Sequence, residues 1–147
     1  MLSVLDPLCS SPEPYRPGLI AQEIDTCVHA GFPSPAEDFQ AVRIDVLKHI
    51  VRHPQATYTL RVRGDSMRDE GVFDGDVILV DRAIKPRHGL IVVAVVDGAF
   101  TCKKLWLRAA KLKLQAANPA YEDIVPQDGQ TIEVWGVVLA SIKQFKT

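Results

Sequence analysis

Apolar and polar positions alternate, or apolar residues stand together in short blocks, through most of the chain beyond residue 56. Gly, Pro and Asp residues separate these runs, which is typical of strands joined by turns. Asp97-Gly98 lies between two of them and is the strongest hairpin signal in the sequence. Almost no helical periodicity accompanies these runs, so they predict a mostly β fold, either a sandwich or a partly open barrel. The predicted strands cover residues 57–63, 77–80, 90–96, 99–107, 111–115 and 131–142.

One segment repeats its apolar residues at helical intervals. Between Arg43 and Val51 the apolar side chains at 44, 47, 50 and 51 fall on one helical face, and Pro54 follows just beyond them. One short helix is therefore predicted over residues 43–51.

The first 38 residues are rich in proline and serine, and their six prolines interrupt any helix or central strand. This composition predicts an extended arm. The arm offers no room for the two or three amphipathic helices of a helix-turn-helix DNA reader. The expected organisation is a mobile arm over residues 1–38 and a β-rich domain over residues 39–147.

Composition narrows the class of protein. A chain of 147 residues suits one modest domain. Its formal net charge of −1 provides no basic electrostatic field for nucleic-acid binding, so direct sequence-specific DNA binding is not expected. Cys9, Cys27 and Cys102 form no Cys-x-x-Cys pair, and the four histidines show no metal-binding spacing. No metal and no cofactor are therefore expected. No apolar run is long enough to span a membrane, which predicts a soluble cytoplasmic protein.

Two residues of the predicted β region suit nucleophilic catalysis. Ser66 follows Gly64-Asp65 at the end of one predicted strand, and Lys103 lies within another. A serine hydroxyl is almost wholly protonated at neutral pH, so it needs a base within hydrogen-bonding reach. Lysine can be that base only when burial lowers its pKa from about 10.4. The apolar residues around Lys103 on both strands of the predicted hairpin favour such burial.

Alternation along the strand places Lys103 and Lys104 on opposite faces, so one of them can turn inward while the other faces water. The residues alone leave open which lysine is buried. Gly64 permits a tight turn before Ser66, and an amide in the Gly64–Met67 turn is a candidate donor to the oxyanion of a tetrahedral intermediate.

Ala30-Gly31 is a candidate substrate on the same chain. These two small residues would let an extended backbone lie close against a β edge, and a cut between them would leave residues 31–147 with the β domain whole. Nucleophile, base and substrate together suggest a protein that cuts itself. Each piece also has an ordinary explanation, because Gly-Asp-Ser is a common turn, a strand lysine is usually solvated, and Ala-Gly suits a linker.

A set of short motifs extends from the candidate cleavage site to the C-terminal region. They are Ala30-Gly31-Phe32-Pro33-Ser34-Pro35-Ala36, His53-Pro54-Gln55-Ala56-Thr57-Tyr58, Gly64-Asp65-Ser66-Met67, Asp74-Gly75-Asp76, Val80-Asp81, His88-Gly89, Phe100-Thr101-Cys102-Lys103-Lys104-Leu105 and Trp135-Gly136-Val137-Val138. In content and order the chain resembles the LexA and UmuD family of self-cleaving SOS-response proteins, and within it the UmuD branch with MucA, RumA and ImpA.

The resemblance carries specific expectations. It implies a mostly β catalytic domain behind a mobile arm, with Ser66 as nucleophile, Lys103 as general base and Ala30-Gly31 as the bond that is cut. It also implies a homodimer whose self-cleavage is stimulated by the RecA filament on single-stranded DNA. The truncated dimer would then serve a UmuC-like, Y-family polymerase in error-prone translesion synthesis.

Three rival interpretations remain. A LexA-type transcriptional repressor would need the DNA-binding domain for which the arm has no room. A leader peptidase also uses serine and lysine, but it acts at a membrane and needs an anchor. A module that only binds the polymerase, with Ser66 and Lys103 vestigial, would differ from the leading interpretation in failing to cut itself.

Overall fold

The computed structural model describes residues 13–14, 20–24, 30–31 and 41–147. Its contacts divide the chain into two units, one of residues up to Tyr15 together with His53–Thr147, the other of Arg16–Arg52. The predicted boundary between residues 38 and 39 falls outside the described residues.

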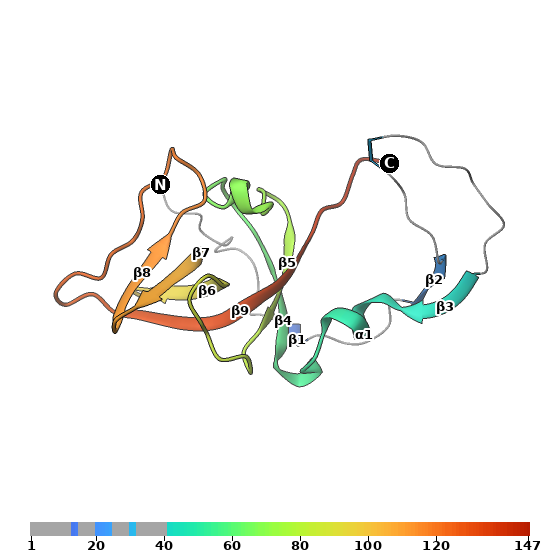
Figure 1. Cartoon of the computed structure of the whole chain (residues 1–147), viewed down its shortest axis with the longest axis horizontal. Coiled ribbons are helices and arrows are strands. Elements are labelled where there is room, and N and C mark those ends of the chain that lie inside the picture. Colours follow the sequence, from blue (N-terminus) through green and yellow to red (C-terminus); the bar gives the residue numbers. More distant parts are fainter. Residues whose placement is uncertain (1–12, 15–19, 25–29, 32–40) are drawn as a thin grey trace. The chain divides into compact units, whose positions relative to one another are not determined.

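Strands greatly outnumber helices among the described residues, which confirms the predicted mostly β fold class (Figure 1). The smaller unit contains β2 (Ile20–Ile24), β3 (Ala41–Asp45) and the helix α1 (Val46–Ile50). The larger unit contains β1 (Glu13–Pro14), η1 (Pro54–Ala56), β4 (Thr57–Arg61), η2 (Arg68–Glu70), β5 (Val77–Asp81), β6 (Ile91–Val96), β7 (Ala99–Arg108), β8 (Lys111–Gln115) and β9 (Ile132–Ile142), where η denotes a 3-10 helix.

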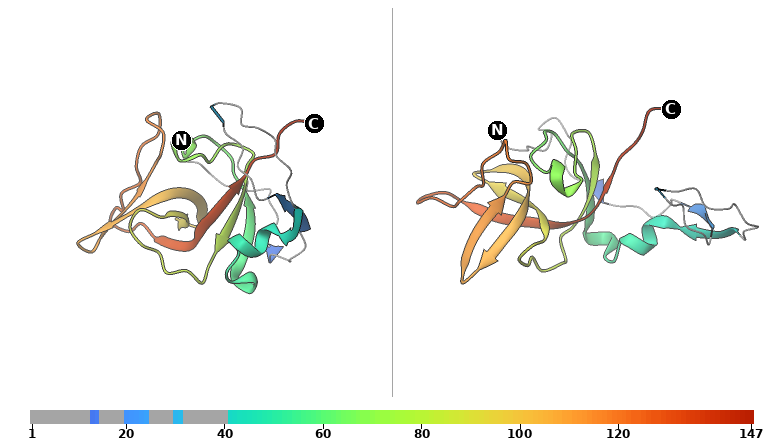
Figure 2. Two further views of the ribbon diagram at one scale, coloured as in Figure 1. Left: turned by 45° about the vertical axis from the view of Figure 1, so that its right-hand side comes forward. Right: turned by 45° about the horizontal axis from the view of Figure 1, so that its top comes forward.

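Seven strands of the larger unit form one antiparallel sheet in the order β1-β4-β5-β9-β6-β7-β8. The strand that comes last in the sequence, β9, lies between β5 and β6 and joins the two halves of the sheet (Figure 1). At one end of this strand order lies the β7–β8 hairpin, drawn in orange in Figure 2. One open sheet with β1 and β8 as its outermost strands is closer to the predicted partly open barrel than to a sandwich of two sheets.

The middle strands of the sheet are buried on both faces. Along β6, Val93 belongs to one apolar cluster, whereas Val92 and Ala94 belong to the other. Successive side chains of a strand point to opposite faces, so the two clusters cover the two sides of the sheet here. Burial on both faces explains why the sequences of β5 and β6 are continuous apolar runs, without the alternation expected of a half-exposed strand.

Gly136 occupies a crowded position on β9 between β5 and β6. A Cβ atom added there would lie 2.6 Å from Val80 Cγ1 and 3.3 Å from the Asp81 carbonyl oxygen. We therefore expect Gly136→Ala to lower the free energy of unfolding by about 1–3 kcal/mol, because the neighbouring strand must shift. Denaturant unfolding measures this change. Gly31→Ala is the control, since a Cβ there meets nothing within 4 Å; an equal effect of the two substitutions would contradict the steric explanation.

The helix in the smaller unit is shorter than its sequence pattern predicts. Residues 43–45 belong to β3, which pairs antiparallel with β2 and sets Ile20 opposite Asp45. The helix begins only after Asp45, whose carboxylate accepts hydrogen bonds from the amides of Leu47 and Lys48. Helical spacing in the sequence could not reveal that this stretch has a strand partner some twenty residues away.

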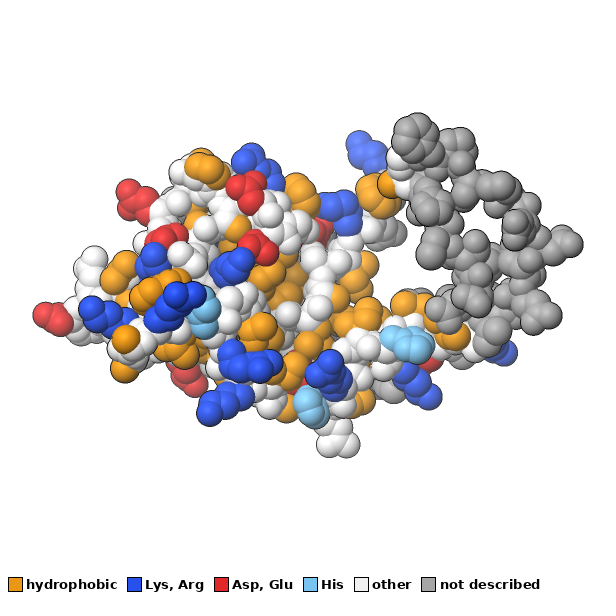
Figure 3. Space-filling model, in the orientation of Figure 1, with side chains coloured by type: hydrophobic (Ala, Val, Ile, Leu, Met, Phe, Trp, Pro, Cys, Tyr) orange, Lys and Arg blue, Asp and Glu red, His pale blue; other side chains and the backbone are white. Residues whose placement is uncertain are grey.

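Acidic and basic side chains both occur on the face shown in Figure 3, in keeping with a nearly neutral chain. Within the described ranges, no helix is long and apolar enough to cross a membrane.

Candidate active site

Ser66 lies in the loop between β4 and η2, and its side chain is fully buried. The loop turns at Gly64, whose φ of +90° lies in the left-handed region that favours glycine. The Gly64 amide donates to Asp74 Oδ1 over 2.7 Å, which ties the start of the loop to the turn before β5. The sequence pattern extended this strand to residue 63, whereas β4 ends at Arg61.

The structure settles which of the two adjacent lysines is buried. Lys103 is fully buried on β7. Lys104 points to the other face of the strand, where its side chain is 36% exposed and forms an ion pair with Glu70. Strand alternation thus gives one lysine an apolar environment and leaves its neighbour in contact with water.

Ser66 and Lys103 meet inside the larger unit. Lys103 Nζ lies 2.6 Å from Ser66 Oγ, 3.1 Å from the Cys102 carbonyl oxygen and 3.3 Å from Thr101 Oγ1. Burial lowers the pKa of Lys103 from 10.5 to about 8, because desolvation disfavours the ammonium ion. Burial raises the pKa of the neighbouring Cys102 thiol to about 12, so this cysteine stays protonated near neutral pH.

A lysine with a pKa near 8 is neutral in a substantial fraction of molecules at mildly alkaline pH. In that form its lone pair can accept the proton of a hydroxyl 2.6 Å away. The same contact in the ammonium form has Nζ donating to Oγ, which suppresses nucleophilic attack. The pair therefore has the geometry and the acid–base property required of a serine nucleophile with a lysine base.

Next to the nucleophile, the Met67 side chain is buried, and the backbone amides of Ser66 and Met67 have no hydrogen-bond acceptor among the described residues. Met67 is 1% exposed and packs in the apolar cluster that includes Val62 and Cys102. Within the described part of the chain, the amides of Ser66 and Met67 have no recorded acceptor, whereas the Gly64 amide is bound to Asp74. Open amides beside a nucleophile are the kind of donor that an oxyanion requires.

The candidate cleavage site belongs to the other unit of the structure. Ala30 and Gly31 are both exposed and form a bend within the Arg16–Arg52 unit. Residues 25–29 and 32–40, which flank this bond, lie outside the described residues.

Sequence reasoning missed the segment at Ala117 and Asn118. The Ala117 amide donates to the Ser66 carbonyl oxygen over 2.7 Å, and Asn118 Nδ2 donates to the Asp65 carbonyl oxygen over 2.9 Å. Asn118 is 8% exposed, so its amide group is a buried polar side chain with a defined partner. The only signal in the sequence was a turn-forming Asn-Pro pair, which gives no hint of a partner some fifty residues earlier.

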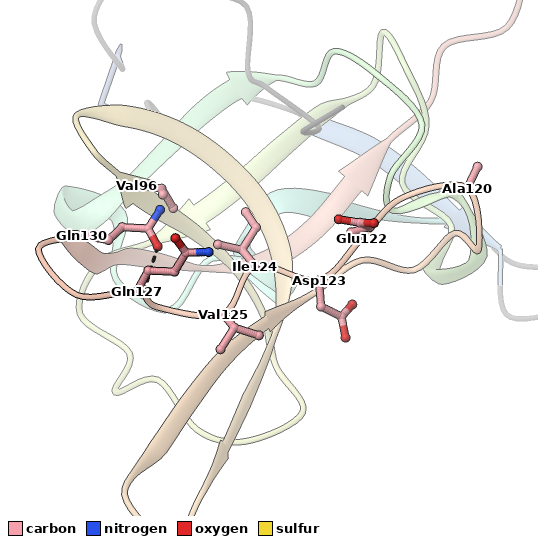
Figure 4. Close-up of a pocket in the computed structure, with 8 residues that line it drawn as sticks. All are labelled: Val96, Ala120, Glu122, Asp123, Ile124, Val125, Gln127 and Gln130. Atoms are coloured by element: carbon pink, nitrogen blue, oxygen red, sulfur yellow. Dashed lines mark hydrogen bonds between the residues drawn. The ribbon is translucent and has the colours of Figure 1, made fainter.

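A separate surface pocket of about 530 Å³ contains neither Ser66 nor Lys103 (Figure 4). Most of its lining comes from residues 120–130, including Glu122 and Asp123. In the part of the chain that the structure describes, no three or more His, Cys, Asp or Glu side chains form a group that could hold a metal ion.

The chain matches one protein-family model over residues 22–139, that of the family described as Peptidase S24-like. This match spans most of the chain, including both residues of the buried pair. The chain belongs to the Peptidase S24-like family. Membership of this family supports serine peptidase chemistry in general.

Curated relatives place the Peptidase S24-like chain in the predicted UmuD and MucA branch. It is 42% identical to Protein MucA of Salmonella typhimurium over 117 residues, 78% of this chain and 79% of that protein. It is 43% identical to Protein ImpA of Escherichia coli over 115 residues, 78% of this chain and 77% of that protein. Similarity also reaches LexA repressor 2 of Xanthomonas oryzae pv. oryzae, 37% identical over 82% of this chain but only 57% of the repressor.

Proposed function

We propose that this protein cuts its own Ala30–Gly31 bond, with Ser66 as nucleophile and Lys103 as general base. The observation that carries the proposal is the 2.6 Å approach of Lys103 Nζ to Ser66 Oγ inside a buried site. Both side chains are fully buried, and a buried lysine that has lost much of its proton affinity is costly to keep unless it has a task. Membership of a peptidase family supports the same chemistry.

The reaction proceeds in two balanced steps. Neutral Lys103 takes the Oγ proton as Ser66 attacks the Ala30 carbonyl carbon, and the resulting ammonium then gives that proton to the departing Gly31 nitrogen. The ester between Ser66 and Ala30 is hydrolysed when Lys103 takes a proton from water, the hydroxide adds to the carbonyl carbon, and Oγ leaves with a proton from the same lysine. The products are two chains, one ending at Ala30 and the other beginning at Gly31.

The biological setting follows from the UmuD and MucA resemblance. In it, the full-length cytoplasmic homodimer responds to the RecA filament on single-stranded DNA, which favours the conformation that cuts. The truncated dimer then acts as the accessory subunit of a UmuC-like, Y-family polymerase during SOS mutagenesis. Identities of 41–43% to MucA, SamA and ImpA over most of this chain support this assignment.

The decisive experiment reads intact masses of the purified protein. One sample is incubated at mildly alkaline pH, and a second with RecA, single-stranded DNA and a nucleotide, each beside Ser66→Ala. The expected result is one new large fragment that begins at Gly31 and is absent from the variant. A folded protein whose mass stays unchanged under both conditions would favour a polymerase-binding module with a vestigial pair.

A further inference from the structure

Three hydrogen bonds join residues 117–118 to residues 65–69, which belong to the nucleophile loop and to η2. Asn118 Nδ2 donates to the Asp65 carbonyl oxygen, and the Ala117 amide donates to the Ser66 carbonyl oxygen. In the opposite direction, the Asp69 amide donates to the Ala117 carbonyl oxygen over 2.8 Å. The loop is therefore held along one side by a segment that is distant in sequence and belongs to the same unit.

These bonds also orient two amide groups. A trans peptide is planar, with its C=O and N–H pointing in opposite directions, and the described chain contains no cis peptide bond. The Asp65 carbonyl oxygen accepts from Asn118 Nδ2 over 2.9 Å and from the Arg68 amide over 3.2 Å, so the Ser66 N–H in the same peptide must point the opposite way. The bond from Ala117 to the Ser66 carbonyl turns the Met67 N–H in the same manner.

Neither oriented amide has a hydrogen-bond acceptor among the described residues. One belongs to the nucleophile Ser66 and the other to the next residue, Met67. We infer that Asn118 is a positioning residue which, by holding the Asp65–Ser66 peptide, directs the Ser66 amide toward the oxyanion and fixes the place of Ser66 Oγ. This inference rests on the proposed function of Ser66. It assigns to Asn118 a role that acts through the peptide, without contact with the reacting atoms.

The two ends of the Asn118 side chain have separable tasks. Its Nδ2 holds the Asp65 carbonyl, whereas its Oδ1 accepts a hydrogen bond from the Ala120 amide over 3.0 Å and closes a local turn. Asn118→Asp keeps an oxygen for the turn and removes the donor to Asp65. Asn118→Ala removes both. Comparison of the two variants separates the orientation of the nucleophile loop from the stability of the turn.

A fluorophosphonate probe tests the inference on the full chain without needing the arm to reach the site. Ser66 Oγ attacks phosphorus, the P–F bond breaks, fluoride leaves, and Lys103 takes the hydroxyl proton. The phosphonyl oxygen stands where the oxyanion of a cleavage reaction would be. The labelling rate therefore reports both the place of Oγ and the orientation of the oxyanion donors.

We expect Asn118→Asp and Asn118→Ala to slow labelling of Ser66 at least about tenfold at alkaline pH. Asn118→Asp should lower the thermal midpoint, because its buried carboxylate faces the Asp65 carbonyl oxygen without a donor between them, so labelling is compared at a temperature at which every variant is folded. The labelling rate of Asn118→Ala, which adds no charge, should keep the wild-type midpoint in pH while its plateau falls. A variant that only loosened the fold would admit water to Lys103 and move that midpoint upward. If Asn118→Asp does not fold, Asn118→Ala still tests the loss of the donor to Asp65, and its thermal midpoint reports the loss of the turn.

Asp123→Ala is the matched control. Asp123 Oδ1 accepts a hydrogen bond from the Ala116 amide over 3.0 Å, so this carboxylate braces the same segment without touching the nucleophile loop. Labelling of this variant is expected within about twofold of wild type. Wild-type labelling rates in folded Asn118→Asp would overturn the inference alone. If the buried Ser66 of the wild-type chain is not labelled, the rate at which the fragment beginning at Gly31 forms replaces the labelling rate in each comparison. If the wild-type chain is neither labelled nor cut faster than Ser66→Ala, the nucleophile assignment fails and the inference fails with it.

Discussion

Substitution of Lys103 by methionine is expected to slow self-cleavage at least about a thousandfold, because a serine hydroxyl without a base is a poor nucleophile. Methionine has a similar length and no charge, so the buried position remains filled. The loss of the contact between Nζ and Ser66 Oγ is then the main change at the site. Intact-mass analysis over time measures the rate of appearance of the fragment that begins at Gly31.

Lys104→Met is the natural control for this experiment. It removes the adjacent lysine, which lies on the other face of β7 and pairs with Glu70. This control should cut at close to the wild-type rate, since exposed ion pairs contribute little to stability. Equal loss of cleavage in the two variants would refute the assignment of Lys103 as the base.

Lys103→Met should also raise the free energy of unfolding at neutral pH, by about 1–3 kcal/mol. At that pH both the folded and the unfolded wild-type chain hold the Lys103 proton, so folding must bury a charge. Between a folded pKa of about 8 and an unfolded pKa near 10.5, the unfolded chain alone retains the proton. Wild-type stability therefore rises with pH through this window, and the advantage of Lys103→Met shrinks. Denaturant unfolding at several pH values checks both signs.

Self-cleavage of the wild type should accelerate roughly a hundredfold from about pH 6 to about pH 10, with half of the maximum near pH 8. Only molecules with neutral Lys103 react, and their fraction rises about tenfold for each pH unit well below the pKa. The rate should then level off once Lys103 is fully deprotonated. A time course of fragment formation at each pH gives the profile.

Ser66→Ala measured over the same pH range supplies the background from hydroxide-catalysed hydrolysis. Circular dichroism at each pH confirms that the protein stays folded. A rate that is flat across the range, or one that turns upward only near pH 10.5, would show that burial has not tuned this lysine for the reaction.

Local sequence patterns predicted the elements whose structure is decided locally. The hairpin around Asp97-Gly98 and the strand over residues 111–115 lie where the pattern put them, since turn chemistry and alternation act between near neighbours. β1 and β2 were not predicted, because strand pairing can stabilise a short stretch that shows no strong pattern of its own. The Pro14 position in β1 is compatible with pairing because that strand is at the edge of the sheet.

The features of the candidate site also fall into those that the sequence predicted and those that it could not. Motif resemblance predicted Ser66 and Lys103 as the pair, and strand alternation indicated that only one of the two lysines could turn inward. That Lys103 is the buried one depends on the packing of β7 against its neighbours, which no local pattern contains. The role of Asn118 could not be predicted for a related reason, since its partner is a backbone carbonyl, and every residue has one whatever its side chain.

The position of β9 in the sheet has a consequence for how the site responds to distortion of the fold. Ser66 follows β4 and Lys103 lies on β7, and in the strand order β9 lies between the half of the sheet that contains β4 and the half that contains β7. A substitution that displaces β9 would therefore shift one half against the other and change the distance between Ser66 Oγ and Lys103 Nζ. Gly136 lies on this strand, so crowding at that position would alter the geometry of the pair as well as the stability of the fold.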